Sequence, residues 1–219
     1  MDENNNNIEL RSICAECNEV SCGEPGDYYP DWCLQNSGSW LEKALVEYQK
    51  PENKKLYKTA AYVESTGYKE WPRLQEIAEF ALKASYENIG LAFCIGLKRE
   101  AEIAAQYFTS RGLKVNSAVC CCGSINKSRL DVPPEDHLNP DSDFEAGCNP
   151  VGQAKMLAET GTEFNIVLGL CVGHDSLFFK YSEAPATVLA VKDRVLGHNP
   201  LAAIYNSNSY YSHLFENEK

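Results

Sequence analysis

Residues 88–95 read NIGLAFCI, a short apolar run that determines how the rest of the chain is interpreted. A strand covered on both faces of a parallel sheet is almost continuously apolar, whereas a helix normally needs a longer segment. The next segment, residues 97–111, instead spaces apolar side chains such as Ala101 and Phe108 at helical intervals. The two segments together predict a buried strand that leads into an amphipathic helix.

The same alternation of strand and helix continues toward the carboxyl terminus. Further strands are predicted at residues 113–121, 165–170 and 186–191, with helices starting at Asn149-Pro150 and covering His174–Tyr181. Strands that alternate with helices imply right-handed crossovers and a parallel sheet. The predicted fold class is therefore α/β, with an open, mainly parallel four-stranded sheet and helices on both faces.

The chain before the first strand has a different character. Residues 1–10 are rich in Asn and acidic side chains and are expected to be disordered. Residues 11–37 form a cysteine-rich segment with Gly and Pro but few apolar positions, so that a bound metal is the simplest source of its order. Residues 38–219 contain a helical lead-in and the α/β domain. We expect this part to form one compact unit with the cysteine-rich segment.

Composition narrows the possible partners. The chain of 219 residues has 20 Lys and Arg against 31 Asp and Glu, for a formal net charge of −11. Phosphate backbones repel an acidic chain without a basic stripe, so no nucleic-acid partner is expected. No apolar run is long enough to span a bilayer and the polar start does not resemble a signal peptide, which predicts a cytoplasmic protein without membrane contact. Thiols stay reduced there, so the ten cysteines favour metal or redox chemistry over disulfides.

The first group of cysteines lies within the cysteine-rich segment. It consists of Cys14, Cys17, Cys22 and Cys33. The C-x-x-C spacing of the first two lets both sulfur atoms face one ion, and four thiolates suit either an iron–sulfur cluster or a tetrahedral zinc ion. We favour the iron–sulfur cluster, although the spacing after Cys17 fits both. The alternative is four incidental thiols in a flexible segment.

A second group of cysteines follows the predicted strands. The positions favoured as ligands of a cofactor or metal lie after the second strand, before the next helix and after the third strand: Cys122, Cys148 and Cys171. The carboxyl ends of parallel strands meet at one edge of the sheet, where such folds bind ligands. We therefore expect these sulfur atoms to lie close together at that edge.

Two cysteine assignments are left open at this edge. Cys120, Cys121 and Cys122 are consecutive, and neighbouring residues on a strand point to opposite faces, so only one or two of them can be ligands. Cys94, near the end of the first strand, is equally compatible with a buried core residue, because free cysteine is often buried.

Charged and imidazole side chains follow the third and fourth strands. The candidates for catalysis or for holding a small anionic ligand are Lys192, Asp193, Arg194, His198 and His174. Two cations and a histidine on the rim of the ligand crevice could bind an anion by charge-assisted hydrogen bonds. The alternative interpretation is a solvated charge run, with His174 as an ordinary surface residue.

Several of these motifs resemble a known family. The segments that carry the resemblance are CAEC at residues 14–17, LAFCIGL at 91–97, CNP at 148–150, GLCVGHDSLF at 169–178 and KDRVLGHNP at 192–200. They are similar to domain-of-unknown-function family 1847, cysteine-rich bacterial and archaeal proteins often described as metal-binding. The resemblance implies metal binding and supplies no reaction.

Two hypotheses follow for the function. The first is a metal-binding protein, preferably with an iron–sulfur cluster, that carries a redox or small-anion site at the strand ends and works with a redox partner protein. The second is a non-catalytic, zinc-stabilised domain that senses or carries a small ligand or metal. Neither a G-x-G-x-x-G nor a phosphate-binding G-x-x-x-x-G-K motif is present, so nucleotide binding is not indicated.

Overall fold

The computed structural model describes residues 10–19, 21–26 and 28–216. The chain divides into two compact units, Met1–Lys58 and Thr59–Lys219. The tail expected to be disordered, residues 1–10, lies outside the described residues except for Leu10. Each unit is described by itself below.

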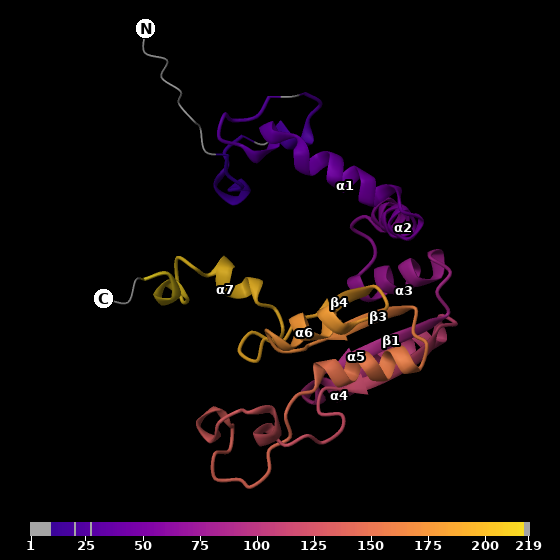
Figure 1. Cartoon of the computed structure of the whole chain (residues 1–219), viewed down its shortest axis with the longest axis vertical. Helices are drawn as coiled ribbons and strands as arrows, with labels where there is room; N and C mark the ends of the chain where they lie inside the picture. Colours follow the sequence, from indigo (N-terminus) through magenta and orange to yellow (C-terminus); the bar gives the residue numbers. More distant parts are fainter. Residues whose placement is uncertain (1–9, 20, 27, 217–219) are drawn as a thin grey trace. The chain divides into compact units, whose positions relative to one another are not determined.

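The second unit is built on a four-stranded sheet (Figure 1). Its strands are β1 (Asn88–Phe93), β2 (Lys114–Val119), β3 (Phe164–Leu168) and β4 (Ala186–Ala190). They are arranged in the order β2-β1-β3-β4, and each neighbouring pair is parallel. The prediction of an open, parallel α/β fold is thus confirmed.

Helices cover both faces of this sheet (Figure 1). On one face lie α3 (Arg73–Lys83) and α4 (Lys98–Ser110), and on the other lie α5 (Pro150–Glu159) and α6 (His174–Tyr181). The alternation of side chains along β1 separates the two cores, because Leu91 packs with α3 and α4 whereas Ala92 packs with α5 and α6. Both faces of β1 are therefore buried, which explains why its sequence is apolar throughout.

Helix α5 lies unusually close to the centre of the sheet. A Cβ atom added to Gly90 would lie 2.1 Å from Oδ1 of Asn165 and 2.9 Å from Cδ1 of Leu157. Asn165 is itself buried, accepts a hydrogen bond from the Thr162 hydroxyl and donates one to the Ser182 hydroxyl. Glycine at this position leaves room for a buried polar side chain whose hydrogen bonds are satisfied within the protein.

The remaining helices lie toward the two ends of the chain. They are α1 (Ser39–Gln49), α2 (Pro51–Gly67), which crosses the boundary between the units, and α7 (Leu201–Tyr205). Helix α2 begins at a proline, whose missing N–H costs nothing in the first turn of a helix. In the described part of the chain, no helix combines the length and apolar character that crossing a membrane requires.

Candidate functional site

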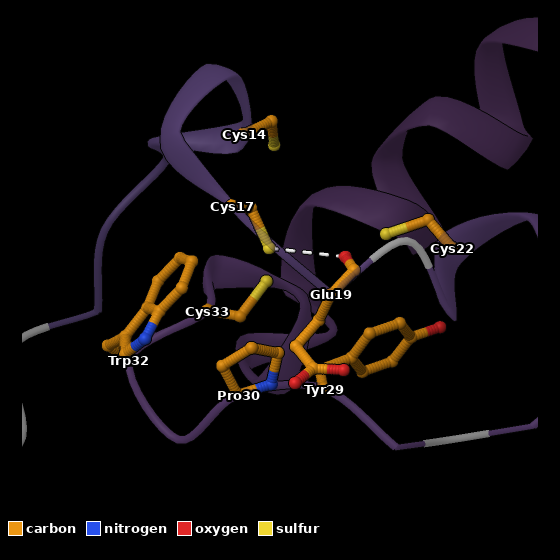
Figure 2. A pocket seen from close by; sticks show the side chains of 8 residues that line it. All are labelled: Cys14, Cys17, Glu19, Cys22, Tyr29, Pro30, Trp32 and Cys33. Carbon is orange, nitrogen blue, oxygen red and sulfur yellow. Dashed lines mark hydrogen bonds between the residues drawn. The ribbon is translucent and has the colours of Figure 1, made fainter.

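The four N-terminal cysteines line one pocket of about 230 Å³, shown in Figure 2. The other lining residues of this N-terminal pocket are Glu19, Tyr29, Pro30 and Trp32. Cys33 is buried and Cys17 is partly exposed, while Cys14 and Cys22 are exposed. Residues up to nineteen positions apart in the sequence thus reach the same space, as a thiolate site requires.

Short turns and a single bridge position these cysteines. Cys14 begins a 3-10 turn that the N–H of Cys17 closes by donating to the Cys14 carbonyl over 3.3 Å. The two ends of the segment are joined where the Arg11 N–H donates to the Trp32 carbonyl, at 2.7 Å, and the Leu34 N–H donates to the Arg11 carbonyl, at 3.0 Å. This parallel bridge between Arg11 and Cys33 brings the C-x-x-C turn beside the last cysteine.

The sulfur atoms in the pocket have protein partners of their own. The thiol of Cys17 donates to the Glu19 carbonyl at 3.2 Å, and the Gln35 amide nitrogen lies 3.7 Å from the Cys22 sulfur (Figure 2 shows the first of these contacts). Across residues 10–19, 21–26 and 28–216, no three His, Cys, Asp or Glu side chains have the arrangement of a metal-ion site. Metal ligation by the pocket cysteines therefore stays a prediction.

A second set of thiols gathers in the other unit, at the carboxyl edge of the sheet. These sheet-edge thiols are Cys94 after β1, Cys120 after β2, Cys148 before α5 and Cys171 after β3. Cys94 and Cys120 extend the sheet, because the N–H of Cys94 donates to the Leu168 carbonyl and the N–H of Cys120 donates to the Phe93 carbonyl. The edge where such folds bind ligands is thus lined with sulfur.

Three of the sheet-edge thiols lie in one cluster, in which Cys148 packs against the buried Cys94 and Cys120. The thiol of Cys120 donates to Cys148, which raises the pKa of Cys120, with burial adding to the rise. The same hydrogen bond lowers the pKa of Cys148. Cys120 also accepts hydrogen bonds from Cys94 and from the backbone N–H of Ile95, the latter over 3.3 Å. The Cys148 thiol therefore loses its proton more readily than the Cys120 thiol.

The structure distinguishes among the three consecutive cysteines. Cys120 contacts Cys148, whereas the sulfur of Cys122 lies 3.7 Å from the Asn149 carbonyl that it faces. The N–H of Cys122 donates to the Val119 carbonyl, so the chain has already turned out of the strand at this residue. The sequence pattern contained a signal for this difference, since Cys94 and Cys120 continue the same alternating face as Ala92 and Ala118.

Gln153 of α5 holds the ends of β1 and β2 together beside these cysteines. Its amide nitrogen donates to the carbonyls of Phe93, at 3.2 Å, and Ala118, at 2.7 Å, and its side chain is fully buried. Sequence reasoning did not select this residue. A polar side chain on the apolar face of a predicted helix was the signal that could have identified it, because buried amides need fixed partners.

The long polar loop before α5 is extensively hydrogen-bonded and positions Cys148. The N–H of Gly147 donates to the Ile125 carbonyl, and the N–H of Asn149 donates to the Cys120 carbonyl at 2.6 Å. The side chain of Asn149 accepts the N–H of Gly152, as predicted for the first turn of this helix. Cys148 is therefore fixed between a loop closure and a helix cap.

An ion pair closes the same loop further out. The ammonium of Lys127 lies 2.5 Å from a carboxylate oxygen of Glu145, whose two oxygens also accept the backbone N–H groups of Leu138 and Asn139. Lys127 and these N–H groups lower the pKa of Glu145 from its ordinary 4.5 to about 2. A carboxylate with a lowered pKa stabilises the folded loop above its ordinary pKa, and this contribution is lost as the pH falls from about 4.5 toward 2.

We expect Glu145→Gln to loosen the loop at neutral pH, because an amide cannot replace the charge paired with Lys127. Hydrogen exchange at the amides of Leu138 and Asn139 should then be faster in the variant than in the wild type. The wild-type amides should approach the variant's rate only in acid, below pH 4.5. Glu135→Gln, at an exposed carboxylate of the same loop, is the control, and equal exchange in all three proteins would contradict the assignment.

The predicted cations also lie at the sheet edge. The guanidinium of Arg194 donates to the Cys171 sulfur over 3.0 Å, and this hydrogen bond raises the pKa of Arg194. The Lys192 ammonium lies 3.3 Å from the point where a Cβ of Gly96 would be, and the Cys94 sulfur lies 3.8 Å from the same point. Arg194 therefore contacts a sheet-edge thiol directly, and Lys192 lies in the same region of the edge as Cys94.

Asp193 and His198 shape the loop that carries Arg194. The Asp193 carboxylate accepts the N–H groups of Val195, at 3.0 Å, and Leu196, at 2.8 Å. The backbone N–H of Asp193 donates to the ring atom Nδ1 of His198 at 3.1 Å. The backbone N–H of His198 in turn donates to the Asp193 carbonyl. Asp193 therefore orients His198 through its backbone rather than its carboxylate.

His174 is the first residue of α6. Within the described residues its Nδ1 atom is buried and has no hydrogen-bond partner. The structure thus places all five predicted charged or imidazole residues after β3 and β4. Catalytic roles for them stay predictions.

Comparison with known proteins identifies relatives that cover most of the chain. A family described as "Protein of unknown function (DUF1847)" matches residues 33–189, which include every sheet-edge thiol. An uncharacterized protein of Methanocaldococcus jannaschii is 44% identical over 198 residues, covering 90% of this chain and 95% of its relative.

Proposed function

The chain belongs to the DUF1847 family of proteins of unknown function, and we propose that it is a thiolate metal-binding protein whose N-terminal pocket holds the metal. One observation carries the proposal: Cys14, Cys17, Cys22 and Cys33 line a single pocket. Such a segment has little apolar area of its own to bury. Metal binding would therefore supply folding free energy to it.

The size of the pocket favours an iron–sulfur cluster over a single zinc ion. Its volume of about 230 Å³ is many times the roughly 10–15 Å³ that a cavity needs to hold one water molecule. A zinc ion holds its sulfur ligands at about 2.3 Å from the metal. A cluster places its cysteine ligands farther apart and fills more of the space.

The occupant determines the role of the protein. With an iron–sulfur cluster it would transfer electrons in the cytoplasm, and a redox protein would be its partner. Lys192 and Arg194 would then bind a small anion at the strand ends, where charge-assisted hydrogen bonds are strong. With zinc the N-terminal segment would be a structural module, and the protein would sense or carry a small ligand or metal.

Anaerobic purification of the full chain tests the proposal. We expect brown protein with broad absorption toward the blue end of the visible spectrum, and iron and acid-labile sulfide in matching amounts. Colourless protein with stoichiometric zinc would support the zinc alternative. If the purified chain contained neither metal, and reconstitution with iron and sulfide or with zinc also failed, thiolate metal binding would be rejected.

A further inference from the structure

We propose that the sheet-edge thiols form a second thiophilic metal centre, built by the α/β unit independently of the N-terminal pocket. Its ligands would be Cys94, Cys120, Cys148 and Cys171. The ligand set differs from the one that the sequence favoured, because Cys120 replaces Cys122 and Cys94 is added.

The convergence of these thiols is the first argument. They come from the ends of three strands and from the residue before an Asn-capped helix, and Cys148 packs against the buried cluster that contains Cys94 and Cys120. A core cysteine needs only apolar neighbours, and a disulfide needs only one other thiol. Four sulfur atoms from four segments would supply the ligand number of a closed zinc site or an iron–sulfur cluster. Their side chains would have to turn toward a common centre on binding, because no three of the described Cys side chains have the arrangement of a metal-ion site.

The backbone around Cys120 is the second argument. Its sulfur accepts the N–H of Ile95, its own N–H donates to the Phe93 carbonyl, and its carbonyl accepts the N–H of Asn149. Hydrogen bonds from backbone N–H groups to cysteine sulfur stabilise the thiolate form that ligates metals and clusters. Metal binding would release the thiol protons to solvent, leaving these donors to face thiolates.

Charge complementarity is the third argument. A divalent ion held by four thiolates carries about two excess negative charges. Two cations lie near this set of sulfurs: Arg194 donates a hydrogen bond to Cys171, and Lys192 and Cys94 both lie close to the point where a Cβ of Gly96 would be. Gly96 leaves the space next to Lys192 free of a side chain, since a Cβ there would lie 3.3 Å from the ammonium. The two cations would offset the charge of the bound centre.

Substitution of neighbouring cysteines gives a matched test. In full-length protein already carrying Cys14→Ser and Cys17→Ser, cobalt(II) should still produce a thiolate charge-transfer band, because the second centre does not use the N-terminal pocket. Addition of Cys120→Ser should abolish that band, and addition of Cys122→Ser should leave it intact. A band that survives Cys120→Ser, or is lost equally with Cys122→Ser, would overturn the assignment.

The wild-type protein provides a second measurement that does not depend on how variants fold. Cys122, Cys148 and Cys171 are all partly exposed, so an alkylating reagent can report on each. With zinc bound, or with iron and sulfide bound, Cys148 and Cys171 should resist alkylation while Cys122 reacts. A chelator should make all three reactive. Equal labelling of all three with metal present, or a Cys120–Cys148 disulfide in protein purified anaerobically without added reductant, would refute the second centre.

These experiments separate the two proposals. Loss of the N-terminal site would leave Cys148 protected in the α/β unit, whereas loss of the second centre would leave the metal of the N-terminal pocket in place. Zinc and iron with sulfide are tested in parallel, so the protecting metal also identifies the occupant.

Discussion

Replacement of both Cys14 and Cys17 by serine is expected to remove the metal of the N-terminal pocket and to make residues 11–37 susceptible to proteolysis. The segment is held by a few backbone hydrogen bonds around Arg11 and Cys33 and by little buried apolar surface. Structural zinc sites contribute about 10–16 kcal/mol of apparent binding free energy in zinc-finger peptides, which is as large as the stability of a whole domain. Loss of two ligands should therefore abolish the order of the segment.

Limited proteolysis followed by mass spectrometry measures this effect. Cleavage within residues 11–37 should be rapid in the double variant and in chelator-treated wild type, and slow in metal-bound wild type. Cys171→Ser, in the other unit, is the matched control and should leave the segment resistant. Wild-type resistance and metal content in the double variant would show that the pocket does not depend on a metal.

The fold was largely predictable because the strand and helix periods differ so clearly in the second half of the chain. Residues 88–95 marked a buried strand, and the structure has β1 at Asn88–Phe93. The helix His174–Tyr181 has the predicted bounds. The strands end earlier than predicted, at Val119 and Leu168, because the chain turns at Cys122, whose N–H donates to the Val119 carbonyl, and at Gly169, which has a positive φ. Apolar character alone does not show where a strand ends, since cysteine and glycine occur both within strands and in the turns that follow them.

The C-terminal segment was less predictable. The sequence of residues 199–215 favours one continuous helix, whereas in the structure α7 covers Leu201–Tyr205 and a 3-10 turn covers Ser212–Phe215. The intervening residues are rich in Ser and Asn, whose side chains compete with the helical backbone for hydrogen bonds. The side chain of Ser209, for example, donates to the Asn206 carbonyl at 3.2 Å.

The contacts of individual site residues required the structure. The gathering of cysteines at one edge followed from topology, but the link between Cys120 and Cys148 depends on the register of β1 against β2. The turn that commits the Asp193 carboxylate to backbone N–H groups is likewise a local geometry that residue types do not specify. Sequence reasoning therefore located the edge, and the structure indicates which thiols on it are in contact.

Phe178→Ala is expected to be among the most destabilising single substitutions in the α/β unit. Phe178 of α6 is 0% exposed and belongs to the same buried cluster as Cys94 and Cys120. Truncation of a buried Phe to Ala costs about 3–5 kcal/mol, through lost apolar burial and the cavity that remains. Because α6 begins three residues after Cys171, a loosened helix should also disturb the sheet-edge thiols.

Phe179 provides a matched control at the next position. It is 40% exposed and touches Phe178 edge-on, with the ring centroids 6.2 Å apart. Phe179→Ala should therefore cost about 1 kcal/mol or less. Denaturant unfolding followed by far-ultraviolet circular dichroism compares the two variants, and alkylation of Cys171 in metal-loaded protein reports on the thiols. If the two variants lost equal stability, Phe178 would not anchor α6. A further outcome is that Phe178→Ala unfolds more readily and still keeps Cys171 protected from alkylation. That result would show that the packing of Phe178 does not position the sheet-edge thiols.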